Sequence, residues 1–225
     1  MPEFLILKCQ GAMQAWGGHT YEDYRPSLIF PTRSAVIGLL GACLGIVREQ
    51  PEQLKLLNES FELTVLAHRL RHVEHRHFKG ERKLRTVSLH KMTDYHTVLD
   101  ARRADGGKRE DAIVSRREYL CDAEFTLALS FKELAEYSLE RVLQAIKKPK
   151  YTPYLGRRSC PLQRPLFESI ISAETAQQAL KQIEQDGTLY SETPLLNGHE
   201  MQVRDLPLFG KTRRFVTRPV YVLGG

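Results

Sequence analysis

The sequence predicts an α+β fold, and three observations support this prediction. Apolar runs typical of β-strands alternate with segments of helical periodicity, in the order strand, helix, strand, strand, helix. A long polar and charged excursion separates the second strand from the third. Further short apolar runs follow towards the C-terminus. This order suits a ferredoxin-like sandwich with an inserted hairpin, followed by a small β-rich C-terminal region.

The N-terminal elements follow from composition and periodicity. Residues 3–9 (EFLILKC) form a continuous apolar run, which predicts a buried strand. Residues 11–32 are rich in Gly, Pro and aromatic residues, so we expect a long loop. Residues 32–49 have apolar side chains at helical spacing, and Thr32 or Ser34 can cap the start of this helix. A short helix is expected near residues 51–57.

The middle of the chain contains the predicted insertion. Residues 61–70 predict a second strand, and residues 123–131 predict a third. Between them, two semi-regular arms flank the turn signal ADGGKRED and suggest a long hairpin that has too few apolar residues for the core. Residues 132–148 predict an amphipathic helix whose inward positions are Leu134, Leu139, Val142, Leu143 and Ile146.

The C-terminal third predicts shorter elements. Residues 166–172 suggest a strand, residues 173–185 an amphipathic helix, and residues 187–198 and 215–225 further short strands. We therefore expect one domain over residues 1–150, with the insertion at about 85–118, and a smaller region over residues 151–225.

Composition narrows the functional classes. The chain has 225 residues, of which 42% are hydrophobic, so it can bury a substantial core. It has no run of about eighteen apolar residues and no signal-peptide pattern at the N-terminus, so we expect neither a membrane span nor secretion. The four cysteines are widely separated without a C-x-x-C pair, which argues against a zinc site and a disulfide framework. These features predict a cytoplasmic protein without a metal or other cofactor.

Positive charge is concentrated in two zones. Residues 69–117 contain fourteen Lys/Arg and seven Asp/Glu, and residues 147–164 contain six Lys/Arg and no acidic residue. Because the whole chain has a net charge of +6, the remainder is acidic in total. Such localised charge is expected of a protein that binds a polyanion, most often nucleic acid.

The second zone, residues 147–165 (KKPKYTPYLGRRSCPLQRP), combines basic, aromatic and proline residues. Prolines restrict the backbone, so side chains here should point in defined directions. Tyr151 and Tyr154 offer faces on which bases can stack, and Arg157 and Arg158 offer guanidinium groups to phosphates. A second phosphate site is predicted at the start of the helix after residue 32, where Arg33 and Ser34 add donors to the backbone N–H groups.

Signals for catalysis are weaker. His68 and His72 have a metal-compatible spacing only in a helix, and this segment, which also contains His75 and His77, is better explained as a basic, solvated loop. His96, with Tyr95 or Lys91 assisting, would suit metal-independent cleavage of RNA. The sequence lacks the nucleotide-loop, metalloprotease and hydrolase motifs G-x-x-x-x-G-K-[ST], H-E-x-x-H and G-x-S-x-G.

Five segments carry a resemblance to a known family. MQAWG, FPTRSAVIGLLGACLGI, DYHTVL, REYLCDAEFTLAL and YTPYLGRRSCPL occur in this order. With them the chain resembles the CasD family, the Cas-five subunits of the type I-E CRISPR surveillance complex Cascade, within the RAMP superfamily. The resemblance spans nearly the whole chain.

The resemblance implies a non-catalytic RNA-binding subunit with a ferredoxin-like (RRM-like) domain and a β-hairpin thumb. It implies that the chain holds the 5′ handle of the CRISPR RNA (crRNA). It also implies contact with the backbone subunit through the thumb, with the large subunit that reads the protospacer-adjacent motif (PAM), and with target DNA indirectly. The residues implied at the RNA are Tyr154, Arg157, Arg158 and Arg117, with Tyr151, Met13, Gln14, Trp16, Arg33 and Ser34 as further candidates. A type I-C-like endoribonuclease that processes precursor crRNA is the alternative.

Overall fold

A seven-stranded sheet forms the centre of the computed structural model, which describes residues 1–75, 82–86, 88–101, 106–108, 110–210 and 214–224. The strands lie in the order β10-β1-β9-β4-β11-β13-β12, and all neighbours are antiparallel. The predicted mixed α/β fold is therefore confirmed. The strands are β1 (Glu3–Gln10), β4 (Phe61–His68), β9 (Glu124–Phe131), β10 (Phe167–Ser172), β11 (Gly187–Ser191), β12 (His199–Leu208) and β13 (Arg214–Leu223).

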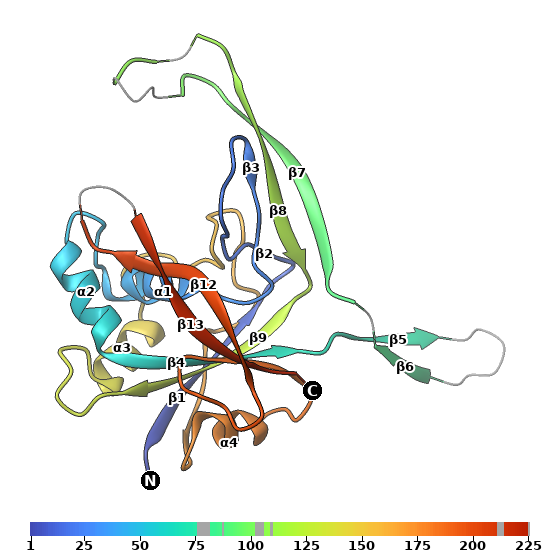
Figure 1. Cartoon of the computed structure of the whole chain (residues 1–225), viewed down its shortest axis with the longest axis vertical. Helices are drawn as coiled ribbons and strands as arrows, with labels where there is room; N and C mark the ends of the chain where they lie inside the picture. Colours follow the sequence, from blue (N-terminus) through green and yellow to red (C-terminus); the bar gives the residue numbers. More distant parts are fainter. Residues whose placement is uncertain (76–81, 87, 102–105, 109, 211–213, 225) are drawn as a thin grey trace.

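Helices cover both faces of this sheet (Figure 1). On β1, Leu5 and Leu7 belong to the larger core cluster, together with residues of α1 (Arg33–Leu44), α2 (Pro51–Glu59) and α3 (Leu139–Lys147). Phe4 and Ile6 belong to the smaller cluster, with residues of α4 (Ala176–Lys181). Successive strand residues point to opposite faces, so the continuous apolar run of β1 is explained by burial on both sides.

Helix α1 begins where the sequence indicated. The Thr32 hydroxyl accepts a hydrogen bond from the Ala35 N–H at 3.3 Å and donates one to the Trp16 carbonyl at 2.9 Å. Thr32 is thus the N-cap and also ties the helix to the preceding loop. The helix ends at Leu44, and its C-cap Gly45 has a φ of 77°, which favours glycine.

Two hairpins extend from the body (Figure 1). The long arm consists of β7 (His90–Val98) and β8 (Ile113–Cys121), and β8 also pairs with β2 (Met13–Gln14) and β3 (Tyr24–Arg25). The short arm consists of β5 (Arg71–His75) and β6 (Arg82–Thr86). The long hairpin predicted from sequence is present. The histidine-rich segment, predicted as a loop, contains paired strands, and His77 lies outside the described residues.

Three expectations need correction or qualification. Leu134 was expected to be buried in a helix, but α3 begins after its N-cap Ser138 and Leu134 is fully exposed. Strand β12 was not predicted, and the loop expected over residues 11–32 contains the short strands β2 and β3. Strands β10 and β11 join the same sheet as β1 and β4, so the sheet continues past residue 150. The division of the chain into two regions at residue 150 stays a prediction.

Candidate nucleic-acid interface

The basic loop, residues 147–165, is held in place by backbone hydrogen bonds. The Lys150 and Tyr151 N–H groups donate to the carbonyls of Cys43 and Ala42, both at 3.0 Å. Further along, the Leu155 N–H donates to the Cys160 carbonyl at 2.8 Å, and both of these side chains are fully buried. The loop is therefore closed on itself and fixed to the end of α1, as expected for a segment that presents side chains in defined directions.

The loop also packs against the chain near β2. The Ala15 N–H donates to the Leu155 carbonyl at 3.1 Å. Gly156 has a φ of 85°, and a Cβ atom at this position would lie 1.7 Å from the Ala15 carbonyl oxygen. Only glycine fits both the left-handed backbone and this close approach. The segments MQAWG and YTPYLGRR are thus brought side by side although they are about 140 residues apart.

Arg157 joins the basic loop to the base of the long arm. Its Nη1 donates to the Glu118 carbonyl and its Nη2 to the Arg25 carbonyl, each at 2.9 Å. The guanidinium lies 4.7 Å from the centre of the Tyr119 ring, within cation–π range. Two terminal nitrogens and one face of this group are therefore used inside the protein. Arg157 positions the loop relative to β3 and β8.

The neighbouring side chains point outwards. Arg158 is exposed and, among the residues that the structure describes, has no hydrogen-bond or ion-pair partner. Tyr154 and Tyr151 are 40% and 47% exposed. Arg117, in register with Arg25 across β3 and β8, is half-buried and donates from Nε to the Ser115 hydroxyl at 3.1 Å. Arg158, Tyr154 and Tyr151 are therefore accessible at the surface, unlike Arg157.

The candidate RNA-binding residues near β2 are mostly buried. Gln14 is fully buried and donates to the carbonyls of Ala123, at 2.5 Å, and Cys9, at 3.3 Å. Trp16 is 1% exposed and meets the Phe125 ring edge to face. Met13 is half-buried against the core. These side chains support the backbone on which the basic loop rests.

The hydrogen-bond donors of Arg33 and of the start of α1 have acceptors inside the protein. The Arg33 side chain donates to Asn58, to the Phe61 carbonyl at 2.9 Å and to Glu192 at 2.7 Å. Its backbone N–H donates to the Asp205 carboxylate at 2.7 Å, so an acidic side chain already occupies the helix N-terminus. Burial lowers the pKa of Arg33, although the Glu192 carboxylate opposes the shift. Ser34, half-buried, lies 3.3 Å from the Thr32 hydroxyl.

Sequence reasoning did not identify Glu118, which organises the base of the long arm. Its carboxylate accepts from the Tyr24 hydroxyl, from the Ser27 N–H at 3.0 Å and from Lys91 at 3.2 Å. Burial disfavours its charge, but these hydrogen bonds together hold the pKa of Glu118 below its usual value. Its position just after Arg117 was the only available signal, because its partners are distant in sequence.

The three residues of the alternative catalytic hypothesis do not converge. Tyr95 and His96 are consecutive residues of β7, so their side chains leave opposite faces of the strand. The Lys91 amine is occupied by Glu118 and by the Ser27 carbonyl, which it meets at 3.0 Å. His96 instead has its Nε2 3.0 Å from both the Tyr119 hydroxyl and an Asp94 carboxylate oxygen.

The described part of the chain contains neither a cluster of metal ligands nor a helix that could span a membrane. No group of three or more His, Cys, Asp or Glu side chains there is arranged to hold a metal ion. His68 ends β4 and His72 lies in β5, so they do not share a helical turn. Among those same residues, no helix is both long and apolar enough to span a membrane.

Comparisons with known proteins agree over the full length. Residues 4–221 match the family described as CRISPR-associated protein (Cas_Cas5). The Escherichia coli (strain K12) protein named CRISPR system Cascade subunit CasD is 43% identical over 228 residues, which cover 100% of this chain and 97% of that protein. The matched span includes the sheet, both arms and the basic loop.

Solved structures share the fold. A chain from a CRISPR RNA-guided surveillance complex superposes with a TM-score of 0.70 at 26% identity, covering 98% of this chain and 89% of its own. A crystal structure of a Cas protein gives a TM-score of 0.61 at 22% identity, covering 98% and 93%. At that identity the second similarity supports the fold alone.

Proposed function

This chain belongs to the Cas5 family of CRISPR-associated proteins, and on that premise we propose that it is a non-catalytic RNA-binding subunit of a type I-E Cascade complex. In this proposal it holds the 5′ handle of the crRNA and caps the filament of backbone subunits during antiviral defence. The E. coli relative, named as a Cascade subunit, supports the assignment because the two chains match from end to end.

One observation carries the RNA-binding proposal: Arg157 holds the basic loop against β3 and β8, while the neighbouring Arg158 and Tyr154 side chains remain exposed. Arg158 and Arg117 supply charge for phosphates, and Tyr154 and Tyr151 supply ring faces. Stacking of a base on an aromatic side chain contributes roughly 1–3 kcal/mol. A polyanion bound here supplies the negative charge that the basic loop lacks.

The roles of the other candidate residues are revised within this proposal. Arg157 acts mainly by positioning the loop, and Arg33, Gln14 and Trp16 act by supporting the fold beneath the surface. Their burial and internal hydrogen bonds favour this assignment. Met13 and Ser34 remain candidates for contacts at the edge of the surface.

We further propose that strands β10, β1, β9 and β4, with α1 and α3, form a ferredoxin-like domain. Their antiparallel order supports this, because it is the strand order 4-1-3-2 of a β-α-β-β-α-β unit. The long arm then corresponds to the thumb that contacts the backbone subunit. The large PAM-reading subunit and, indirectly, target DNA complete the proposed partners, and the complex acts in the cytoplasm.

The non-catalytic role is supported by the arrangement of β7, on which Tyr95 and His96 diverge and Lys91 is occupied. The decisive experiment incubates the purified protein in EDTA with a labelled repeat RNA and, separately, with a pre-cut handle RNA. We expect binding of the handle without cleavage of the repeat, with an affinity that falls steeply as salt rises. Site-specific cleavage that disappears in His96→Ala would establish the endoribonuclease alternative instead.

A further inference from the structure

The start of the basic loop carries three lysines that the proposed RNA surface does not use. This lysine cluster consists of Lys147, Lys148 and Lys150. All three side chains are exposed, and among the residues that the structure describes no carboxylate pairs with them. The backbone is fixed, because the Lys148 and Lys150 N–H groups donate to the carbonyls of Gln144 and Cys43, both at 3.0 Å. Three uncompensated charges therefore lie on a segment whose Cα atoms span at most about 11 Å.

Two of these side chains make contacts that restrict where their ammonium groups lie. The Lys147 amine lies 5.0 Å from the centre of the Phe167 ring, within cation–π range. Lys150 lies over Gly45, where a Cβ atom would come within 3.1 Å of three carbons of the lysine side chain. Such contacts cover the apolar part of a lysine and leave its charge in water. Because these side chains are already partly ordered, they lose less entropy when an anion binds.

The lysine cluster and Arg158 lie towards opposite ends of α1. The Lys150 N–H is bonded to the last turn of α1. Gly156 contacts Ala15, and the carbonyl of the next residue accepts a hydrogen bond from Thr32, the N-cap of the same helix. Since α1 has twelve residues, it is about 18 Å long. The basic loop thus runs along α1, with the lysine cluster at one end and Arg158 near the other.

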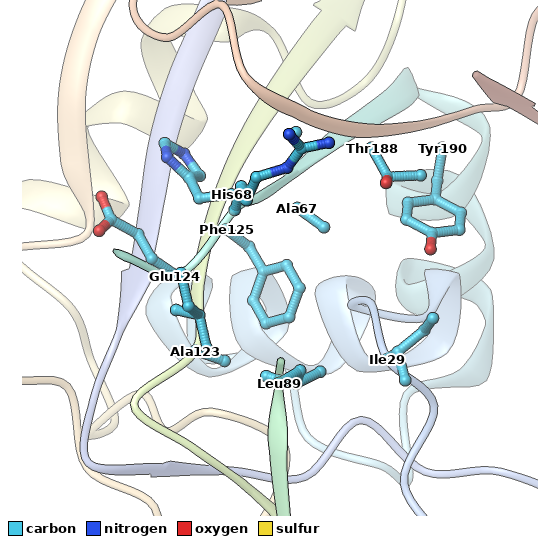
Figure 2. Close-up of a pocket in the computed structure, with 12 residues that line it drawn as sticks. Ile29, Ala67, His68, Leu89, Ala123, Glu124, Phe125, Thr188 and Tyr190 are labelled. Carbon is cyan, nitrogen blue, oxygen red and sulfur yellow. The ribbon is translucent and has the colours of Figure 1, made fainter. Parts of the chain in front are cut away.

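The lysine cluster suits the phosphates of a polymer better than a base or a small anion. An ammonium group is a point charge without the planar fork of arginine, so it fits a phosphate backbone of any sequence. The half-buried Phe167 ring lies under Lys147 and is not free to stack on a base. Small ligands bind in enclosed pockets. Figure 2 shows a pocket of about 190 Å³ with Phe125, Tyr190 and Glu124 in its lining, and none of the described residues that line it is a lysine.

We propose that the lysine cluster is a second site for nucleic-acid phosphates, about one length of α1 away from Arg158. This inference rests on the proposed function, because it extends the anion-binding surface of the basic loop. A DNA duplex carries one negative charge per roughly 1.7 Å of its axis, so several phosphates lie within reach of the three ammonium groups. The phosphates belong either to the crRNA or to a DNA duplex, and the choice of probe distinguishes these two sources.

The test replaces all three lysines by glutamine in the full chain. Three probes are titrated over a range of salt: the handle RNA, the same RNA extended by a single-stranded guide, and a DNA duplex of arbitrary sequence. We expect the affinity for at least one probe to fall roughly tenfold or more. The slope of log affinity against log salt should decrease by about 2 for single-stranded RNA and by about 2.7 for the duplex, because each phosphate contact contributes about 0.7 or 0.9.

The matched control removes the same charge elsewhere. Lys55→Gln, Lys132→Gln and Lys181→Gln together change three exposed positions, on α2, after β9 and on α4. An equal loss of affinity in this control would show that only net charge matters and would overturn the site. Replacing the three lysines of the cluster by arginine should retain the affinity and the salt slope, because the charge is kept.

A merely structural role for the lysine cluster predicts a different result. Lys147 lies in the last turn of α3, where a cation stabilises the helix end. If the glutamine variant melts at a lower temperature while its salt slopes for all three probes are unchanged, the lysines act on the helix alone and the proposal is overturned.

The probes also separate this proposal from the proposed function. A loss with either RNA probe assigns the phosphates to the crRNA, and a loss with the duplex alone assigns them to DNA. If Arg158→Ala with Tyr154→Ala leaves handle affinity unchanged, the proposed handle surface fails. A loss of duplex affinity in the glutamine variant, absent from the matched control, would still establish the lysine cluster as a phosphate site.

Discussion

The start of α1 and the basic loop look alike in sequence, because each sets arginines beside prolines with aromatic residues nearby. At the start of α1, Arg33 is 4% exposed and is surrounded by acceptors from Asn58, Phe61 and Glu192. Asp205 takes the adjacent backbone N–H, and Arg218 binds Asp205 at 2.6 Å. The charges in this region compensate one another inside the protein.

In the basic loop, two consecutive arginines differ in whether their side chains have partners inside the protein. Arg157 donates to two backbone carbonyls, whereas Arg158 remains exposed. The contrast shows that the role of an arginine is set by the acceptors that the fold brings to it. Where carboxylates surround the guanidinium, the residue stabilises the protein, and where they are missing, it is available to an external anion.

The largest effect expected from this contrast is on stability at the start of α1. In Arg33→Met, Glu192 loses one cationic partner and several acceptors lose their donor, so we expect the free energy of unfolding to fall by about 3–5 kcal/mol. Urea denaturation measures this change in the free energy of unfolding. The handle affinity of the folded fraction should stay close to that of the original protein.

Arg158→Met is the matched control, and its stability should change by less than about 0.5 kcal/mol because the side chain is exposed. If Arg33→Met were stable yet bound the handle weakly, Arg33 would be an RNA contact and the comparison would be reversed.

The next largest effect should come from Gly156→Ala. The φ of 85° and the 1.7 Å approach to the Ala15 carbonyl oxygen mean that the backbone has to move. We expect a loss of about 1–3 kcal/mol in stability together with weaker handle binding, because the loop shifts away from β2. Thermal unfolding and a binding titration measure the two effects.

Gly210→Ala serves as the control for Gly156→Ala, since a Cβ atom there would meet no atom within 4 Å. Unchanged handle affinity in Gly156→Ala would show that the position of the loop is irrelevant to binding.

Substitutions of Arg157 and of Arg158 should have different effects on handle binding and on stability. Arg158→Ala should weaken handle binding about tenfold and reduce the slope of log affinity against log salt by about one, with stability unchanged. Arg157→Ala should also destabilise the protein, by about 1–3 kcal/mol, because two carbonyls lose their donor.

Arg157→Lys distinguishes positioning from charge. Lysine keeps the positive charge but lacks the planar fork that reaches both carbonyls. We expect its stability and handle affinity to resemble those of Arg157→Ala. Full recovery by lysine would assign Arg157 to the phosphates.

The parts of the fold that could be predicted are those with local causes. The buried run of β1 and the cap at Thr32 depend on neighbouring residues, and both are present. The start of α3 was misjudged because the helix was extended on the N-terminal side of Ser138, which is itself a good N-cap. Strand β12 contains charged residues and Pro207, so only its pairing with β13 reveals it.

The site was predictable to the extent that composition decides it. The absence of acidic residues in the basic loop predicts a place for an anion, and this stays a prediction; the structure adds that the loop is closed and anchored. The inward orientation of Arg33 was not predictable, because Glu192 and Asp205 lie 159 and 172 positions further along the chain. The same holds for Arg157, whose acceptor on β3 is 132 positions away.

The smallest expected effect tests Glu118, a carboxylate held by hydrogen bonds beside the basic loop. A carboxyl group whose pKa is lower in the folded than in the unfolded protein stabilises the fold above the unfolded pKa of about 4.3, and this contribution is lost as pH falls through the folded pKa. Between about pH 5 and pH 3 the melting temperature should therefore fall less steeply in Glu118→Gln than in the original protein. Glu62→Gln, at an exposed position of β4, should retain the original slope. An unchanged slope in Glu118→Gln would mean that the Tyr24 and Lys91 contacts do not favour the charged carboxylate.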